Sequence, residues 1–111
     1  MKKVEIDINT KGIVVFAKGR GDYDDWLVMV TKVEEVENIG SKNFNVYGHI
    51  FYNITNDVWY FSSGDENYSW GHINHWDFYE PTKEQKQFII DALKKRGYKY
   101  VPILNKIIYK R

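Results

Sequence analysis

The chain has 111 residues, of which 43% are hydrophobic, enough for one domain with a single core. It contains no cysteine, which excludes disulfides, thiolate zinc sites and thiol nucleophiles. Residues 1–8 carry charges where a signal peptide has its apolar core, and no run approaches the roughly 18 apolar residues of a membrane span. We therefore expect one cytoplasmic domain, 1–111, without a cofactor and without a membrane partner.

The charges are distributed unevenly along the chain, although the net charge is only +1. Residues 81–111 hold nine Lys or Arg and two acidic residues, a balance of +7. Residues 1–80 hold seven basic and thirteen acidic residues, a balance of −6. This segregation predicts a dipolar molecule, with a sheet part in 1–80 and a basic helix and hairpin tail in 81–111.

Alternating apolar residues predict antiparallel strands in the sheet part. The segment 4–8 and the run 13–17 flank a polar turn and are expected to form a hairpin. A loop then leads to a third strand at 26–33, and a polar loop at 34–43 leads to a fourth strand at 44–54. Five apolar residues of this fourth strand are expected on one face: Phe44, Val46, Ile50, Tyr52 and Ile54.

The remaining strands of the sheet part are short. An Asn56-Asp57 pair tolerates positive φ and predicts a tight turn into a strand at 58–61. A turn at 64–67 is expected to form the next hairpin, with a strand at 68–73. Five to six such strands predict a strongly curved antiparallel sheet or a partly open, SH3-like small barrel.

One amphipathic helix is predicted at about 83–96. Thr82 is its expected N-cap, and Gln85 completes a capping box. Gly97 supplies the left-handed residue that ends a helix, and a terminal hairpin follows. The fold class is therefore α+β. Four apolar residues recur at helical spacing and are expected to pack on the sheet: Phe88, Ile89, Ala92 and Leu93.

The last third of the chain resembles the tail of small uncharacterised proteins from bacteriophages, prophages and gut bacteria. In those tails a Pro/Ala-Thr-x-Glu-x-Lys helix start, a buried Leu and a Gly-Tyr stop precede a short hairpin. The resemblance implies a phage or mobile-element setting and supplies no activity or catalytic residue. The matching residues here are Pro81-Thr82-Lys83-Glu84-Gln85-Lys86, Leu93 and Gly97-Tyr98.

Two histidines and a carboxylate, His72, His75 and Asp77, are the best candidates for chemistry. On one strand His72 and His75 point to opposite faces, so they chelate one ion only if the strand ends between them. The alternative is a surface role for His72 and a loop position for His75. A small metal-dependent or acid/base enzyme is therefore the third interpretation. The sequence has neither a nucleophile elbow nor a phosphate-binding loop, so we favour a non-enzymatic protein.

Aromatic residues make up 17% of the chain, and twelve of the nineteen lie between Asn43 and Tyr79. The strand 58–61 carries rings on both faces, whereas a domain of this size is expected to bury one face of a single sheet. Either the sheet curls and both faces are covered, or Tyr and Trp side chains form a surface for a protein partner or for self-association. The predicted binding residues are Tyr47, Trp59, Tyr60, Tyr68, Trp70 and Trp76, with Asp22, Asp24 and Asp25 as a charged rim.

The first interpretation is thus a protein-binding module, a phage or mobile-element accessory or inhibitor protein. The basic end of the chain supports an alternative, in which lysines contact nucleic-acid phosphates and sheet tyrosines stack on bases. The balance of −6 in the sheet part disfavours it, because that charge repels a polyanion. The residues of this alternative are Lys83, Lys86, Lys94, Lys95, Arg96 and Lys99.

Overall fold

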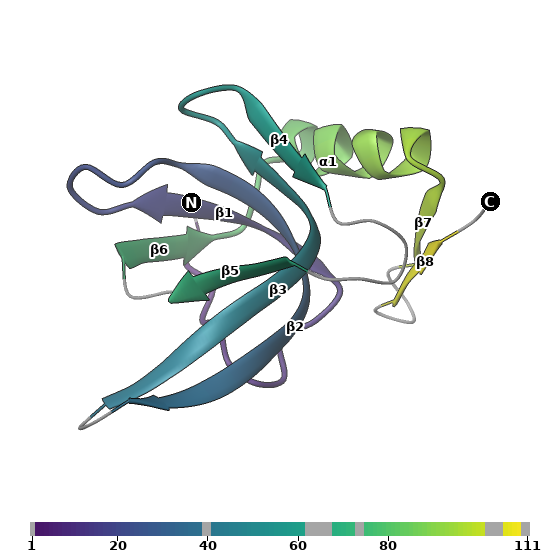
Figure 1. Ribbon diagram of the computed structural model, residues 1–111. Coiled ribbons are helices and arrows are strands. Elements are labelled where there is room, and N and C mark those ends of the chain that lie inside the picture. The colour runs from purple at the N-terminus through teal and green to yellow at the C-terminus, as the bar shows by residue number, and fades with distance from the viewer. Residues whose placement is uncertain (1, 39–40, 62–67, 73–74, 102–105, 110–111) are drawn as a thin grey trace.

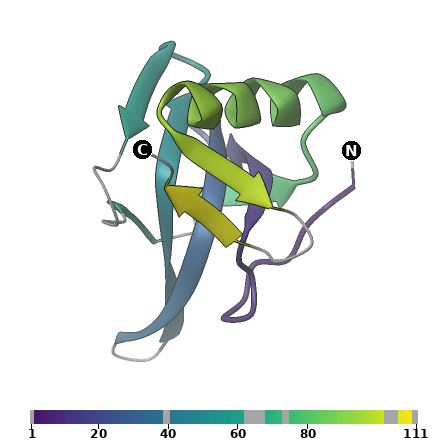
Figure 2. The same ribbon diagram turned by 90° about the vertical axis from the view of Figure 1, so that its right-hand side faces the viewer.

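The computed structural model of the protein describes residues 2–38, 41–61, 68–72, 75–101 and 106–109. A six-stranded antiparallel sheet is covered on one face by a helix, and a separate hairpin follows (Figure 1). The elements are β1 (Ile13–Gly19), β2 (Trp26–Asn38), β3 (Ser41–Asn53), β4 (Val58–Phe61), β5 (Tyr68–His72), β6 (Trp76–Tyr79), α1 (Lys83–Lys95), β7 (Tyr98–Val101) and β8 (Lys106–Tyr109). Figure 2 shows α1 lying across one end of the sheet, with the β7–β8 hairpin below it. The predicted α+β class, the helix and the terminal hairpin are confirmed, and the sheet is open and curved.

The strand order is β4-β3-β2-β1-β6, and β5 also pairs with β3. The long strand β3 has two partners along one edge: its residues 50–53 pair with β4, and its residues 45–48 pair with β5. The predicted hairpin between β4 and β5 is therefore wrong in its partners, and the turn expected at 64–67 lies outside the described residues. β6 was not predicted as a strand, and it pairs with β1.

The predicted hairpin between 4–8 and 13–17 is also wrong. β1 pairs with β2 along residues 13–17, and its other edge pairs with β6 along residues 16–19. The N-terminal residues lie along the outer edge of β6 instead, where the Val4 amide donates to the Phe78 carbonyl at 2.8 Å. A second bond, from the Glu80 amide to the Lys2 carbonyl, is also 2.8 Å long.

The polar loop expected at 34–43 is replaced by paired strands, because β2 and β3 continue as a two-stranded ribbon to Asn38 and Ser41. Two register shifts near Met29 and Val30 interrupt this ladder, and each reverses which face the following side chains occupy. At the first shift Gly48 approaches the Met29 carbonyl so closely that a Cβ would lie 2.4 Å from its oxygen. The predicted shared face of β3 is wrong for this reason: Phe44 and Val46 pack in one cluster, and Ile50, Tyr52 and Ile54 in another.

The sheet buries side chains on both faces. The expectation of one buried face is wrong for β1 and β2, whose residues alternate between two clusters. Val4 and Ile6 of the N-terminal segment pack against the second cluster and help to cover that face. On the helix side the buried residues are Val14, Phe16, Leu27, Met29, Ile50, Ile89 and Leu93. On the other side they are Val15, Ala17, Val28, Val30, Val33, Val46, Phe51 and Phe78.

The two ends of α1 have the predicted caps. The Gln85 amide donates to Thr82 Oγ1 at 3.1 Å, and the Thr82 amide donates to Gln85 Oε1 at 2.9 Å. After the helix, Gly97 has a φ of 87°, the left-handed conformation expected there. Within the described ranges, no helix is long and apolar enough to cross a membrane.

Thr82→Ala is expected to lower the free energy of unfolding by about 1 kcal/mol, because it removes the acceptor for the Gln85 amide. Thr82→Ser keeps the hydroxyl and serves as the control. Urea denaturation followed by far-UV circular dichroism measures both variants. Equal stability of the alanine variant and the wild type would show that the capping bond contributes nothing.

Candidate functional site

The predicted aromatic surface is divided by the alternation of β4. Trp59 and Phe61 are half-buried on the helix side of the strand. Val58 and Tyr60 point to the opposite side, with exposed fractions of 39% and 49%. The Tyr60 ring lies beside Trp26, with a centroid distance of 5.6 Å. Trp59 and Tyr60 therefore do not form one patch.

The helix-side rings form an aromatic cluster that reaches the surface. Trp59 and Phe61 are stacked, with centroids 5.6 Å apart and planes 8° from parallel. The Phe88 ring of α1 lies 5.0 Å from Trp59 and 5.1 Å from Tyr52, and it keeps an exposed fraction of 43%. The rings of Trp59, Phe61 and Phe88 line an open groove of about 360 Å³ between α1 and β4. We call it the α1–β4 groove, and it is bounded by Trp59, Phe61, Phe88, Asp91, Lys95 and Arg96.

The helical repeat explains one wall of this groove. Phe88, Asp91 and Lys95 recur at spacings of three and four residues, so they follow one side of the helix. This side adjoins the stripe of Ile89 and Leu93, which is buried against the sheet. The wall from Phe88 to Arg96 is about 12 Å long at 1.5 Å per residue.

The groove has an aromatic end and a basic end. The Arg96 guanidinium lies 3.9 Å from the Phe61 ring centroid, in cation–π geometry. Lys95 lies next to it in the groove wall, and Asp91 accepts a hydrogen bond from Gln87 at 2.7 Å. Trp, Tyr and Arg are the residues enriched among those that dominate binding energy at interfaces.

The prediction from sequence included Trp59, Lys95 and Arg96 but missed Phe61 and Phe88 as site residues. The apolar repeat of the helix predicts Phe88 on the buried face. The position of Phe88 around the helix axis could have indicated its exposure, because Phe88 lies at the margin of the buried stripe centred on Ile89 and Leu93. A large ring at such a margin packs against a neighbouring edge strand and stays partly exposed.

The predicted acidic rim has structural contacts. The Asp24 carboxylate accepts bonds from the amides of Asn53 at 3.0 Å and Asn56 at 2.9 Å. Trp76 Nε1 donates to the Asp24 carbonyl at 2.9 Å, and Asp25 accepts from the Gly19 amide at 2.9 Å. These bonds fasten the β1–β2 loop to β6 and to the β3–β4 turn. Asp22 is exposed in the same loop.

The other predicted aromatic residues lie on β3 and β5. The Tyr47 ring lies under the Lys32 ammonium group, which is 4.6 Å from its centroid. Tyr68 and Trp70 belong to β5, where the backbone of Tyr68 pairs with Gly48. The side chains of Tyr68 and Trp70 lie outside the described part of the structure.

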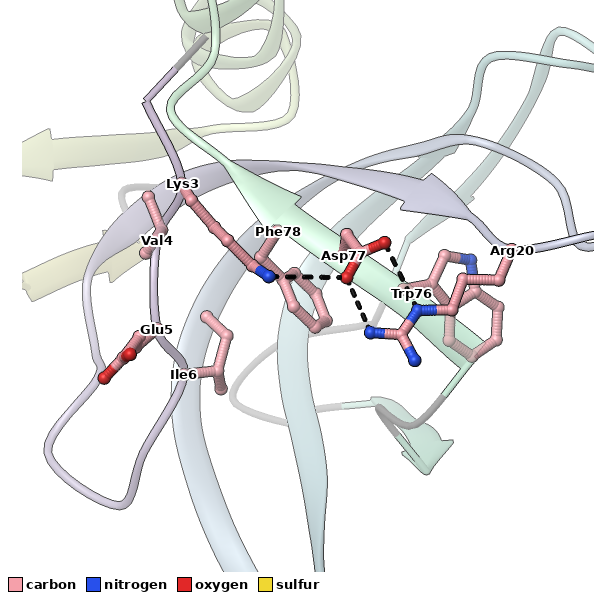
Figure 3. Close-up of a pocket in the computed structure, with 8 residues that line it drawn as sticks. All are labelled: Lys3, Val4, Glu5, Ile6, Arg20, Trp76, Asp77 and Phe78. Carbon is pink, nitrogen blue, oxygen red and sulfur yellow. Dashed lines mark hydrogen bonds and ion pairs between the residues drawn. The ribbon is translucent and has the colours of Figure 1, made fainter.

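The cluster around Asp77 forms an ion-pair network (Figure 3). Asp77 accepts from Arg20 Nη2 at 2.6 Å and from Arg20 Nε at 3.2 Å, and Lys3 Nζ lies 3.7 Å away. His75 is stacked on Tyr23, with centroids 4.2 Å apart. No three His, Cys, Asp or Glu side chains come together among the residues that the structure describes. The side chain of His72 lies outside them.

Asp77→Asn is expected to destabilise the protein at neutral pH and to have a smaller effect in acid. The Arg20 hydrogen bond lowers the pKa of Asp77 below its ordinary value of 3.8. The ion pair therefore stabilises the fold above about pH 4, and its contribution is lost as the pH falls through the lowered pKa. Free energies of unfolding of both proteins, measured from neutral to acidic pH, should converge at the acidic end. A constant difference across this range would show that the charge of Asp77 has no role.

The predicted basic residues do not form one stripe. Lys86 lines a separate hollow with Val4, Val14 and Glu80, whereas Lys95 and Arg96 line the α1–β4 groove. Nine residues separate Lys86 from Lys95, which is about two and a half turns, so they occupy opposite sides of the helix. The other three basic residues are exposed: Lys83, Lys94 and Lys99.

No protein-family model matches the chain, and neither a curated protein nor a solved structure matches it. The candidate site is defined by its geometry alone. It combines a partly exposed Phe88, the stacked pair of Trp59 and Phe61, and two cations at one end of the groove.

Proposed function

We propose that the protein is a non-enzymatic protein-binding module that docks its partner in the α1–β4 groove. The observation that supports this proposal is the juxtaposition of the exposed Phe88 ring, Trp59 and the Arg96 guanidinium in one groove. Such rings bring a large contact area at little cost in rotamer entropy. The setting is that of a phage or mobile-element accessory or inhibitor protein, as the resemblance of its tail implies.

Phe88 is the best residue for a test, because Trp59 packs against the core and its loss would also disturb the fold. We expect Phe88→Ala to weaken partner binding roughly 30-fold, corresponding to about 2 kcal/mol for a residue that dominates an interface. Tyr60→Ala is the matched control, because its ring is exposed to a similar extent on the opposite side of β4.

The experiment is a pull-down with tagged wild type, Phe88→Ala and Tyr60→Ala from nuclease-treated lysate of the native host. A protein retained in stoichiometric amount by the wild type and Tyr60→Ala, and lost by Phe88→Ala, supports the proposal. If Phe88→Ala retains this protein and Tyr60→Ala loses it, the docking site lies on the other side of β4.

The same experiment tests the nucleic-acid alternative. Nucleic acid that is recovered only when nuclease is omitted would support binding through the basic residues. Its affinity for the protein should then fall steeply between low and physiological salt. An interface built on aromatic rings depends little on salt. Self-association through the groove would appear as a concentration-dependent mass in sedimentation equilibrium that Phe88→Ala abolishes.

A further inference from the structure

We infer that the α1–β4 groove receives an extended peptide segment that pairs with the edge of β4 and carries a large apolar residue with an acidic residue two positions away. The inference rests on the proposed function and adds the binding mode and the chemistry of the ligand. It follows from the edge of the sheet, the length of the groove and the distribution of charge.

β4 lies at the end of the strand order. In the described part of the chain β4 pairs with β3 alone, through residues 58–61. The outer edge of a terminal strand presents backbone N–H and C=O groups that an extended peptide can pair with. Because Trp59 and Phe61 belong to this strand, a peptide on its edge lies beside their rings.

The α1–β4 groove and strand β4 have similar lengths. The helical wall from Phe88 to Arg96 is about 12 Å long, equal to three or four residues of extended chain at 3.3 Å each. β4 itself has four residues. Alternate side chains of a paired peptide point to the same face, so two of them reach the groove. One ligand position therefore faces the aromatic end, and the position two residues away faces the basic end.

The charges of the α1–β4 groove are complementary to an acidic side chain. Phe88 and Trp59 define the aromatic end, whereas Arg96 stacks on Phe61 and lies with Lys95 at the other end. A guanidinium on an aromatic face keeps N–H donors in its plane, and these suit a carboxylate.

The test uses two synthetic peptides, Ser-Glu-Ser-Phe-Ser-Glu-Ser and the same peptide with both Glu replaced by Lys. Each is titrated into the ¹⁵N-labelled protein, and the affinity is read from amide chemical-shift changes. We expect the acidic peptide to bind at least about tenfold more tightly, because one of its carboxylates can contact both Lys95 and Arg96 at the basic end. The shifts should map to β4 and to α1 from Phe88 onward.

Two double variants test the role of the cations. Lys95→Gln with Arg96→Gln is expected to abolish the preference for the acidic peptide while the helix is retained. Lys83→Gln with Lys94→Gln is the control, since it removes the same charge from exposed positions outside the groove. A third peptide, N-methylated on Phe and on the two serines that flank it, loses the amide hydrogens on both edges of this segment, and we expect it to bind at least about tenfold more weakly because it can no longer donate to the edge of β4.

Several results would overturn the inference. These are equal affinity for the acidic and basic peptides, a preference that survives Lys95→Gln with Arg96→Gln, and unchanged binding after N-methylation. If a single-stranded oligonucleotide shifts the same amides more strongly than the peptide does, the ligand of the groove is a nucleic acid and not a peptide. If Phe88→Ala no longer binds the lysate partner but the acidic and basic peptides bind the wild type equally, the docking site stands and only this ligand is rejected. If Phe88→Ala still binds that partner, the docking site itself is rejected.

Discussion

Leu93→Ala is expected to lower the free energy of unfolding by about 3 kcal/mol, the middle of the range for a fully buried leucine. Leu93 is only 1% exposed and lies with Ile89 between α1 and the sheet. The truncation leaves a cavity that the helix closes only partly, because the strands below it are held by their ladders. Urea denaturation followed by tryptophan fluorescence measures the loss.

Lys94→Ala is the control for this variant, because Lys94 is the next residue and is exposed. We expect it to change the stability by less than about 0.5 kcal/mol. A loss below about 1 kcal/mol for Leu93→Ala would mean that α1 does not depend on this contact. The α1–β4 groove would then have a wall that is only loosely attached to the sheet.

Gly19→Ala is the second change with a large expected effect, a loss of about 3 kcal/mol. A Cβ at this position would lie 1.9 Å from the Tyr23 carbonyl oxygen and 2.7 Å from that of Asp24. Both atoms belong to the backbone of a loop that is fastened by the Trp76 indole and by the Asp25 carboxylate. The loop must move to admit the methyl group, and these bonds are then lost.

Gly21→Ala separates this steric effect from backbone strain. Gly21 has a φ of 59°, but nothing lies within 4 Å of its Cβ position. Only the cost of the left-handed conformation remains there, about 1 kcal/mol. Thermal unfolding monitored by circular dichroism should rank the two variants. Similar midpoints would show that the close approach at Gly19 is relieved by a small shift of the loop.

The local features of the fold were predictable, because adjacent residues determine them. The capping box of Thr82 and Gln85, the positive φ of Gly97 and the turn at Asp57 all follow from side chains within three or four residues. The choice of strand partners was not. That β5 pairs with β3, and the N-terminal segment with β6, depends on which edges remain open after the sheet has formed.

The candidate site was predictable only in part, for a similar reason. Alternation along β4 correctly placed rings on both faces of the strand. The neighbour of each ring was decided by the position of α1, which brings Phe88 to Trp59 and Arg96 to Phe61. Two register shifts in the β2–β3 ladder also changed which side chains share a face. Neither effect has a signal within a few residues of sequence.

The N-terminal residues lie along the edge of β6 that faces away from β1. An uncovered edge is a template on which further chains add strand by strand, the route to fibrils. Here the Lys3–Tyr79 bridge and the flanking backbone bonds occupy that edge, and two lysines place charge beside it. A further chain that pairs with β6 would have to displace this segment. The edge of β4 is short, and a peptide bound there would cover it and end the sheet on that side.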